Sequence, residues 1–187
     1  MLISFEKPKT ILFLGEEQSL SELASKSGVH HFEKDCALTN TAGNTALTPN
    51  GVPFQYDLII CPDLRASKYF CSMGMAGALQ KCHDSMAVGG KLVIGVEGRS
   101  LLTLVNIAKI KKQASRNQFK SLCMHIVYPS ITNPYKTCRY EKESIKFFYK
   151  NLYPQPLRIS KKCFYGFLQR TKLLALFAPG YIIEIER

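Results

Sequence analysis

The sequence contains no apolar run long enough to cross a membrane. A membrane-spanning helix needs about 20 consecutive apolar residues, whereas the nearest run, Leu173–Ile183, is short and is interrupted by Pro179-Gly180. A secretory signal is missing as well, because no basic region followed by an apolar core occurs in the opening segment MLISFEKPKT. These absences predict a protein that has no transmembrane segment and works inside the cell.

Paired cysteine motifs are also absent. The sequence has seven cysteines, an odd number, and none of them belongs to a Cys-x-x-Cys pair. The spacings typical of zinc fingers and zinc ribbons are therefore missing, and we expect no metal site. Several cysteines lie within apolar runs, for example Cys61 and Cys123. This placement favours free, buried thiols in the cytoplasm or in another reducing intracellular compartment.

Acidic residues are scarce in the second half of the chain. Residues 1–98 carry 8 Lys and Arg against 10 Asp and Glu, a net charge of −2, whereas residues 99–187 carry 17 against 4, a net charge of +13. Such a positive field is typical of proteins that meet a polyanion, such as RNA or a phosphate-bearing substrate, or an acidic protein. A solvated basic surface without any such partner is the alternative.

What the sequence does contain is a strand–helix–strand pattern in its middle. Tyr56–Cys61 is a short apolar run, a helix-length segment covers Ser67–Met86, and Lys91–Val96 is a second apolar run that follows a glycine turn. Two apolar runs around a helix predict a βαβ unit on a parallel sheet. Because ligands bind beyond the carboxyl ends of such strands, Asp63 and Glu97 are expected near any pocket.

The rest of the chain continues the alternation of strands and helices. Thr10–Gly15 and Val29–Phe32 are predicted strands around a helix that begins with the capping pattern of Ser19 and Glu22. A long irregular connection follows at Cys36–Gln55, with one weak strand near Thr45–Leu47. The elements predicted after residue 98 are helices at Ser100–Gln118, Glu141–Leu152 and Lys161–Phe177, strands at Ser121–Tyr128 and Tyr181–Glu186, and a loop, YPSITNPYKTC, bracketed by Pro129 and Pro134. In the first of these helices, the predicted apolar stripe is Leu101, Leu104, Val105 and Ala108.

The motifs follow one another in a set order: a strand, a glycine, a helix, a strand and an acidic residue, then YDLIICPD, GGKLVIGVE, a late helix and a terminal strand. In this order the chain resembles the class I S-adenosylmethionine-dependent methyltransferases over nearly its whole length. Its YPS and NPY loop and its LLALFAPGYIIEIER ending are loosely similar to members from bacterial polysaccharide and lipid clusters. The resemblance implies one α/β domain over residues 1–187, with a nucleotide-binding half (1–98) and a basic C-terminal half (99–187). Its Rossmann-like sheet would be mostly parallel, and an antiparallel last strand, Tyr181–Glu186, would pair with Ser121–Tyr128.

The resemblance also implies a cofactor, S-adenosylmethionine, and three residues that would hold it. Gly15 matches the first glycine loop, Glu33 matches the acid that binds the ribose hydroxyls, with Asp35 as the fallback, and Asp63 matches a polar position after the family's fourth strand. From the residues alone, Glu33 is equally readable as a surface carboxylate. Asp63 is likewise readable as a turn residue after Pro62.

The first loop departs from the family pattern, Asp/Glu-x-Gly-x-Gly-x-Gly. In the segment Leu14–Ser19 only Gly15 matches, and Glu16, Glu17 and Gln18 stand where small residues are usual. Two anionic side chains would meet the carboxylate end of the cofactor, and like charges in a confined pocket cost free energy. The Asn/Asp-Pro-Pro-aromatic motif is also absent, which argues against exocyclic base amines as methyl acceptors.

No residue type in the sequence identifies a catalytic base. His30 and His31 are adjacent on a predicted strand and would point to opposite faces. Cys82 and His83 are adjacent on a predicted helix and would not face each other. His125 is a candidate general base at the end of its strand, or else a histidine satisfied within the core.

Two functions therefore remain open. The first is an S-adenosylmethionine-dependent methyltransferase that acts on a small or glycan-linked hydroxyl or carboxyl group. The second is a catalytically inactive methyltransferase-fold subunit that docks RNA or an acidic partner through residues 99–187. The altered first loop favours the second hypothesis, and the resemblance of the whole chain to enzymes favours the first.

Overall fold

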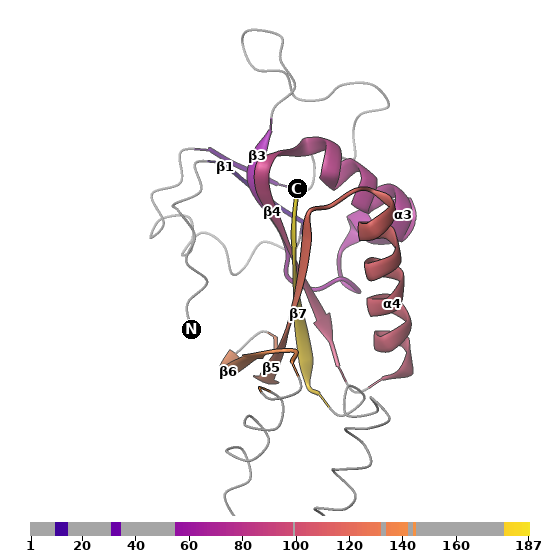
Figure 1. The fold of residues 1–187 in the computed structure, drawn as a ribbon, viewed down its shortest axis with the longest axis vertical. Helices are drawn as coiled ribbons and strands as arrows, with labels where there is room; N and C mark the ends of the chain where they lie inside the picture. Colours follow the sequence, from indigo (N-terminus) through magenta and orange to yellow (C-terminus); the bar gives the residue numbers. More distant parts are fainter. Residues whose placement is uncertain are drawn as a thin grey trace, which may run out of the picture.

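The computed structural model describes residues 10–14, 31–34, 55–98, 100–131, 134–141, 144 and 178–187. Within these ranges the chain forms an α/β fold whose centre is a seven-stranded sheet (Figure 1). The predicted fold class is confirmed, because the sheet is mostly parallel and its last strand runs antiparallel to both of its neighbours.

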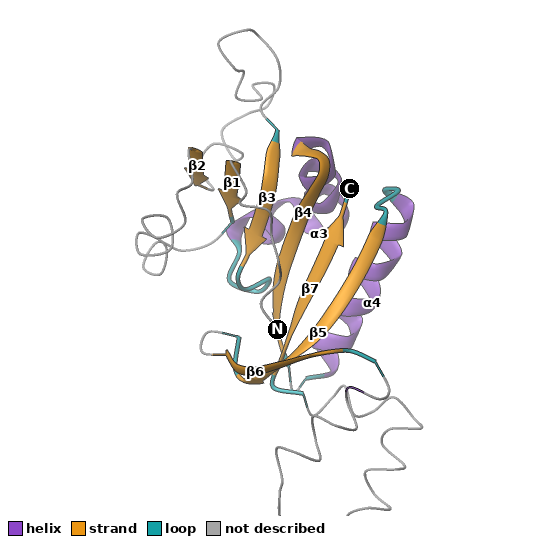
Figure 2. Ribbon diagram, turned by 60° about the vertical axis from the view of Figure 1, so that its left-hand side comes forward, coloured by secondary structure: helices purple, strands orange, loops and turns teal. Residues whose placement is uncertain are grey.

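The sheet order is β2-β1-β3-β4-β7-β5-β6. β1, β2, β3 and β4 pair in parallel, and β7 lies antiparallel between β4 and β5 (Figure 2). The strands are β1 (Thr10–Phe13), β2 (His31–Lys34), β3 (Tyr56–Cys61), β4 (Met86–Glu97), β5 (Ser121–Pro129), β6 (Pro134–Arg139) and β7 (Gly180–Glu186).

Among the described elements, two helices cover one face of this sheet, α3 (Lys68–Ser85) and α4 (Leu101–Arg116) (Figures 1 and 2). Ser100 is the N-cap of α4, and its Oγ accepts a hydrogen bond from the Thr103 N–H group at 3.4 Å. The apolar stripe predicted for this helix was wrong, because Leu101 and Val105 are exposed and a different set of residues is buried: Thr103, Ile107, Ile110 and Ala114. α3 is kinked at Gly74, where the backbone angle φ is 69°. Residues other than glycine rarely adopt a positive φ.

The side chains of β7 alternate between the two faces of the sheet. Tyr181, Ile183 and Ile185 are buried and belong to the core, whereas Glu184 and Glu186 occupy the opposite face. Alternation of this kind is required of a strand with one apolar and one polar face. The predicted pairing of Tyr181–Glu186 with Ser121–Tyr128 is confirmed by a register that runs from Ser121 opposite Glu186 to Val127 opposite Gly180.

Three boundaries predicted from the sequence were wrong. The segment after Pro134 was assigned to a loop, but Pro134–Arg139 forms β6, which pairs antiparallel with β5 at the sheet edge. A proline is tolerated there because the first residue of an edge strand donates no ladder hydrogen bond. β4 begins at Met86 rather than at Lys91, so Gly89-Gly90 lies within the strand. The register with β3 shifts at this point, between the pair Tyr56–Met86 and the pair Leu58–Lys91.

The third wrong boundary concerns the second strand. Val29–Phe32 was predicted, whereas β2 (His31–Lys34) continues two residues beyond Phe32 and pairs with all four residues of β1. Residues 29 and 30 lie outside the described part of the chain. Glu33 is therefore part of the strand, opposite Leu12, rather than the residue that follows it. The register with β1, a tertiary constraint, sets this limit, since boundaries are poorly fixed by local pattern.

Several other predictions lie outside the described residues. They are the helix after Ser19, the weak strand at Thr45–Leu47, the helix Lys161–Phe177 and all of the helix Glu141–Leu152 except residues 141 and 144. Where the chain is described, no helix is long and apolar enough to span a bilayer. Cys61 is buried and outside any disulfide, as its apolar context predicts, whereas Cys123 is only half-buried.

Candidate functional site

The candidate site lies at the carboxyl ends of the parallel strands. Leu14 directly follows β1, and its N–H group donates to the Ile60 carbonyl of β3 at 2.8 Å. The Leu64 N–H group donates in turn to the Gly95 carbonyl of β4 at 2.9 Å. Three strand ends are thus joined at one edge of the sheet, where ligands of parallel α/β sheets bind.

Gly95 permits the closest of these approaches. A Cβ atom at this position would overlap the carbonyl oxygen of Pro62, and it would come within 3.0 Å of Ile131 Cγ2. The turn after β3 can therefore lie directly against β4 only because residue 95 has no side chain. This contact fixes the position of Asp63, one residue beyond Pro62.

Asp63 stabilises its own turn. Its Oδ1 accepts a hydrogen bond from the Arg65 N–H group at 2.9 Å, and its carbonyl accepts one from the Ser67 N–H group at 3.0 Å. Among the described residues, Oδ2 has no hydrogen-bond partner. The structure thus shows Asp63 as a turn residue, with one carboxylate oxygen still available at the sheet edge.

Glu97 is the second carboxylate at this edge. It is the last residue of β4, its side chain is exposed, and it forms no ion pair with a described residue. Its backbone carbonyl accepts a hydrogen bond from Thr103 Oγ1 at 2.7 Å, which ties the strand end to the first turn of α4. The structure therefore brings Asp63 and Glu97 to adjacent strand ends, as the βαβ pattern predicts.

Arg65 is a site residue that the sequence reasoning missed. Its Nη2 donates to Ser100 Oγ at 2.9 Å and to Thr103 Oγ1 at 3.3 Å. The guanidinium group thus links the turn after β3 to the N-terminus of α4. A basic residue in the turn after a parallel strand was the available signal, but its partners are 35 and 38 positions away in the sequence.

The other two predicted cofactor residues are only partly located. Gly15 lies outside the described residues. The backbone of Glu33 lies in β2, separated from β3 by β1, and nothing is described of its side chain. Of the three predicted residues, Asp63 alone has a described side-chain environment at the carboxyl edge.

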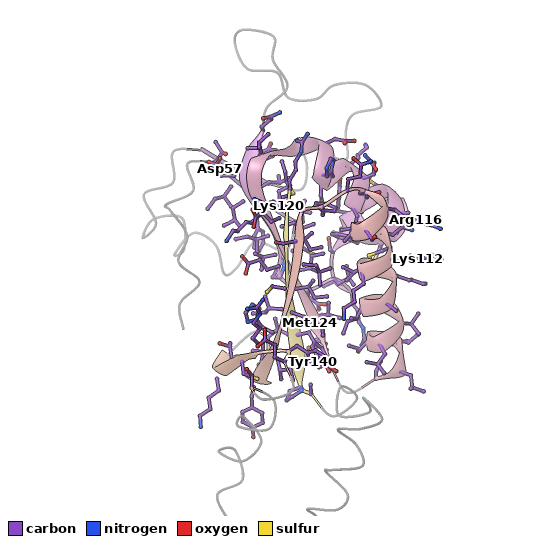
Figure 3. The ribbon with its side chains drawn as sticks, viewed as in Figure 1. Asp57, Lys112, Arg116, Lys120, Met124 and Tyr140 are labelled. Atoms are coloured by element: carbon purple, nitrogen blue, oxygen red, sulfur yellow. The ribbon has the colours of Figure 1, made fainter. Side chains whose placement is uncertain are left out.

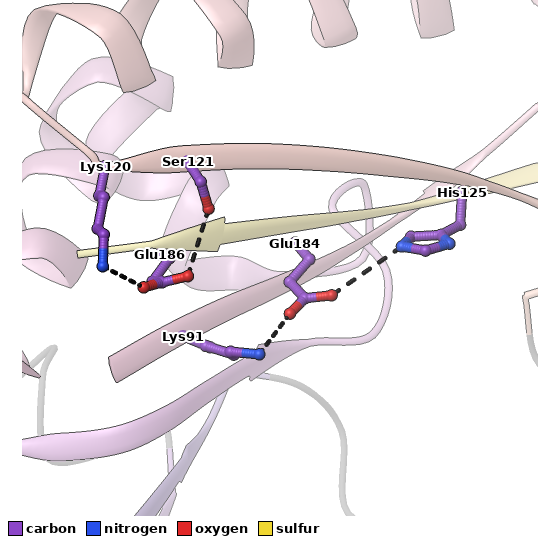
Figure 4. Close-up of polar contacts among 6 residues, drawn as sticks. All are labelled: Lys91, Lys120, Ser121, His125, Glu184 and Glu186. Carbon is purple, nitrogen blue, oxygen red and sulfur yellow. Dashed lines mark hydrogen bonds and ion pairs between the residues drawn. The ribbon is translucent and has the colours of Figure 1, made fainter. Parts of the chain in front are cut away.

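A second polar cluster lies on the sheet face opposite the two helices (Figure 4). Lys91 Nζ and Glu184 Oε1 are 2.9 Å apart, and Glu184 Oε2 is 4.0 Å from His125 Nε2. Beside them, Glu186 pairs with Lys120 at 3.2 Å and accepts a hydrogen bond from Ser121 Oγ at 3.4 Å. These contacts connect β4, β7 and β5, so they contribute to sheet cohesion.

His125 belongs to this cluster. Burial lowers the pKa of its imidazole, Glu184 opposes that shift, and Arg139 adds to it. Its ring faces Glu184, and its backbone pairs with Ile182 within the sheet. This environment favours the reading of a histidine satisfied by the fold over that of a general base.

The Cys82 and His83 pair behaves as expected for neighbours on a helix. Cys82 is buried in the core, whereas His83 stacks edge-on against Phe119, with 5.0 Å between ring centroids, and its Nδ1 lies 3.4 Å from Asp84 Oδ1. Within the described part of the chain, no group of three or more His, Cys, Asp or Glu residues could hold a metal ion.

Comparison with known proteins gave matches among solved structures only. No family model matches the sequence, and no curated protein sequence matches it. A methyltransferase of Thermotoga maritima, described as a possible histamine N-methyltransferase, is 10% identical with a TM-score of 0.46, and the alignment covers 97% of this chain and 83% of that one. A methyltransferase of Archaeoglobus fulgidus, also dependent on S-adenosylmethionine, is 13% identical with a TM-score of 0.48, covering 95% and 85%.

A third similar structure is phosphoethanolamine N-methyltransferase 2 of Haemonchus contortus, solved in complex with S-adenosyl-L-methionine. It is 10% identical with a TM-score of 0.44, and the alignment covers 98% of this chain but 49% of that one. With TM-scores below 0.5, these likenesses leave the function to be inferred from the sheet topology and from the site itself.

Proposed function

We propose that this protein is an S-adenosylmethionine-dependent methyltransferase that transfers a methyl group to a small or glycan-linked acceptor. The observation that carries the proposal is the position of β7, antiparallel between β4 and β5, in a sheet whose other central strands end at one edge. The class I methyltransferases, which the sequence resembles, have an antiparallel last strand in the same place. In that family the cofactor binds at the carboxyl edge.

The chemistry of this edge fits a cationic cofactor. Asp63 has a carboxylate oxygen without a partner among the described residues, and the carboxylate of Glu97 is exposed at the neighbouring strand end. Opposite charges at short range attract, and more strongly where water is partly excluded. S-Adenosylmethionine, when bound, would supply a methyl group activated by a positively charged sulfonium.

The chain's own residues would do three things. Gly15 would let the backbone approach the methionine end of the cofactor, Glu33 would accept hydrogen bonds from its ribose hydroxyls, and Asp63 would lie near its charged end. Arg65 would hold the turn that carries Asp63 against α4. We assign no catalytic base, so positioning of the acceptor would supply most of the rate enhancement.

Calorimetric titration with S-adenosylhomocysteine tests this proposal. We expect binding to the wild type and a rise in melting temperature. Asp63→Asn should weaken binding of S-adenosylmethionine, whose sulfonium is cationic, about tenfold, which corresponds to about 1.4 kcal/mol. Binding of S-adenosylhomocysteine, whose sulfur is uncharged, should change less. The matched control is Asp84→Asn, at the far end of α3, where binding should stay within about twofold of the wild type. Absence of both heat and thermal shift at about millimolar ligand would remove the enzyme proposal.

The second candidate function is a catalytically inactive methyltransferase-fold subunit that docks RNA or an acidic partner. It is favoured by Glu16 and Glu17 in the first loop and by the basic side chains on α4. Binding of single-stranded RNA measured across salt concentrations tests the RNA form. Phosphate contacts predict affinity that falls steeply as salt rises, whereas affinity that ignores salt excludes this mode.

A further inference from the structure

The outermost stripe of α4 is apolar at one end and cationic at the other. Thr103, Ile107, Ile110 and Ala114 are buried against the core and fix which side of the helix faces outward. At 100° per residue, the four side chains centred opposite that buried side fall within about 60° of one another. They are Leu101, Val105, Lys112 and Arg116.

The apolar end of this stripe is unusually exposed. In the described part of the chain, four large aliphatic side chains are exposed, and three of them lie in the first turns of α4. Leu101 is 71% exposed, Leu102 66% and Val105 46%. Single exposed aliphatic residues are ordinary, but a contiguous group marks a surface where another molecule docks.

The cationic end carries positive charge that the described residues do not neutralise. α4 contains no acidic residue, and Lys109, Lys112 and Arg116 are exposed and form no ion pair with any described residue. Lys111 differs, because its Nζ lies 6.0 Å above the Tyr140 ring. Figure 3 shows Lys112 and Arg116 on the outer side of α4, directed away from the sheet.

We propose that the α4 outer face, defined as Leu101, Leu102, Val105, Lys109, Lys112 and Arg116, docks an acidic amphipathic helix of another protein. The partner helix would place aliphatic side chains against Leu101 and Val105 and carboxylates against Lys112 and Arg116. Residues 101 and 112 are separated by about 16 Å along the axis, or about three turns. A helix lying along α4 can match this spacing with ridges-into-grooves contacts.

Three other occupants fit the α4 outer face less well. RNA binding to single strands uses aromatic stacking as well as cations, and this face has no aromatic residue. An anionic membrane would require the apolar end to insert while cations on the same outward stripe, about 16 Å away, stay at the headgroups. A second copy of this chain would bring two surfaces of the same sign together, because the chain carries a net charge of +11.

The test uses the full chain and designed, fluorescently labelled helical peptides in an anisotropy titration. One peptide carries three aliphatic residues in its first turns and four glutamates about three turns later, a second carries the reverse order, and a third mixes the same residues evenly. We expect one of the two segregated peptides to bind at least about tenfold more tightly than the mixed peptide. Raising NaCl from about 50 to 500 mM should weaken that binding.

Substitutions distinguish specific binding at the α4 outer face from non-specific binding elsewhere on the protein. Val105→Asp and Lys112→Glu should each weaken binding of the segregated peptide at least about tenfold. The matched controls are Val88→Asp, at another exposed aliphatic residue, and Lys81→Glu, at an exposed lysine of α3, and both should stay within about twofold of wild type. Circular dichroism melting confirms that each variant is folded, which is expected because all four side chains face solvent or lie partly outside the core.

Anionic phosphatidylserine vesicles and a single-stranded RNA serve as competing probes. The proposal is overturned if either of them binds the α4 outer face more tightly than the segregated peptides do, if the mixed peptide binds equally well, or if folded protein binds no peptide. None of these readouts depends on S-adenosylhomocysteine, so failure here leaves the methyltransferase proposal untouched. Failure of the calorimetric titration likewise leaves the α4 outer face untouched.

Discussion

Replacing Gly95 by alanine should destabilise the protein through one contact at the carboxyl edge. The added Cβ atom would overlap the Pro62 carbonyl oxygen, which belongs to backbone and cannot rotate away. The turn after β3 would have to move off β4. That movement would lengthen the hydrogen bond from the Leu64 N–H group to the Gly95 carbonyl, now 2.9 Å.

The expected cost follows from two effects. Overpacking in a dense interior costs about 1–3 kcal/mol, and a weakened backbone hydrogen bond costs about 1 kcal/mol more. The free energy of unfolding should therefore fall by about 2–4 kcal/mol. For a domain of this size, about 3 kcal/mol corresponds to a decrease in melting temperature of roughly 6–12 °C.

Urea denaturation monitored by circular dichroism measures this change. Gly77→Ala is the matched control, because Gly77 lies within α3 and a Cβ atom there would meet only Met73 Cβ, at 3.8 Å. Alanine at a helical position should stabilise by about 0.5–1 kcal/mol. If Gly95→Ala lowers the free energy of unfolding by less than about 0.5 kcal/mol, the close approach of Pro62 to β4 is wrong.

Two further changes test the same architecture. Ser100→Ala removes the N-cap of α4 and the main acceptor of the Arg65 guanidinium, so it should cost about 1–2 kcal/mol in urea denaturation; an unchanged midpoint would show that neither contact stabilises the fold. His125 has a folded-state pKa below its unfolded value of about 6.5, so the unfolded chain takes up its proton first as pH falls. The free energy of unfolding should therefore decrease as pH drops below about 6.5, and His125→Gln should flatten the decrease; equal pH profiles for the two proteins would contradict the buried environment of His125.

The residues at the carboxyl edge of the sheet show how much of the site can be predicted from local sequence patterns. Asp63 and Glu97 were expected near one another because each follows a predicted strand of a βαβ unit, and parallel neighbours end at the same edge. The structure places them there. Arg65 could not be assigned a partner from the sequence, because Ser100 and Thr103 approach it only after α4 has packed on the sheet.

The sequence by itself determined the local elements of the middle of the chain. The apolar run of β3 and the alternation of β7 each fit a strand, because burial in a strand must match a period of two residues. The segments of α3 and α4 were predicted as helices because each has the length of a helix and lies between two predicted strands. These elements were predicted within one or two residues of their limits. The antiparallel pairing of β7 with β5 was predicted from the resemblance to the class I methyltransferases, and that resemblance rests on the sequence motifs of the same elements.

Only the tertiary structure decided where the edges of the sheet lie and what meets across them. β6 has little apolar character and becomes a strand because β5 offers it unpaired backbone groups. β2 takes its limits from its register with β1. The approach of Pro62 to Gly95 and the cluster around Glu184 join residues that are distant in sequence, and such contacts depend on packing of the whole sheet rather than on any local pattern.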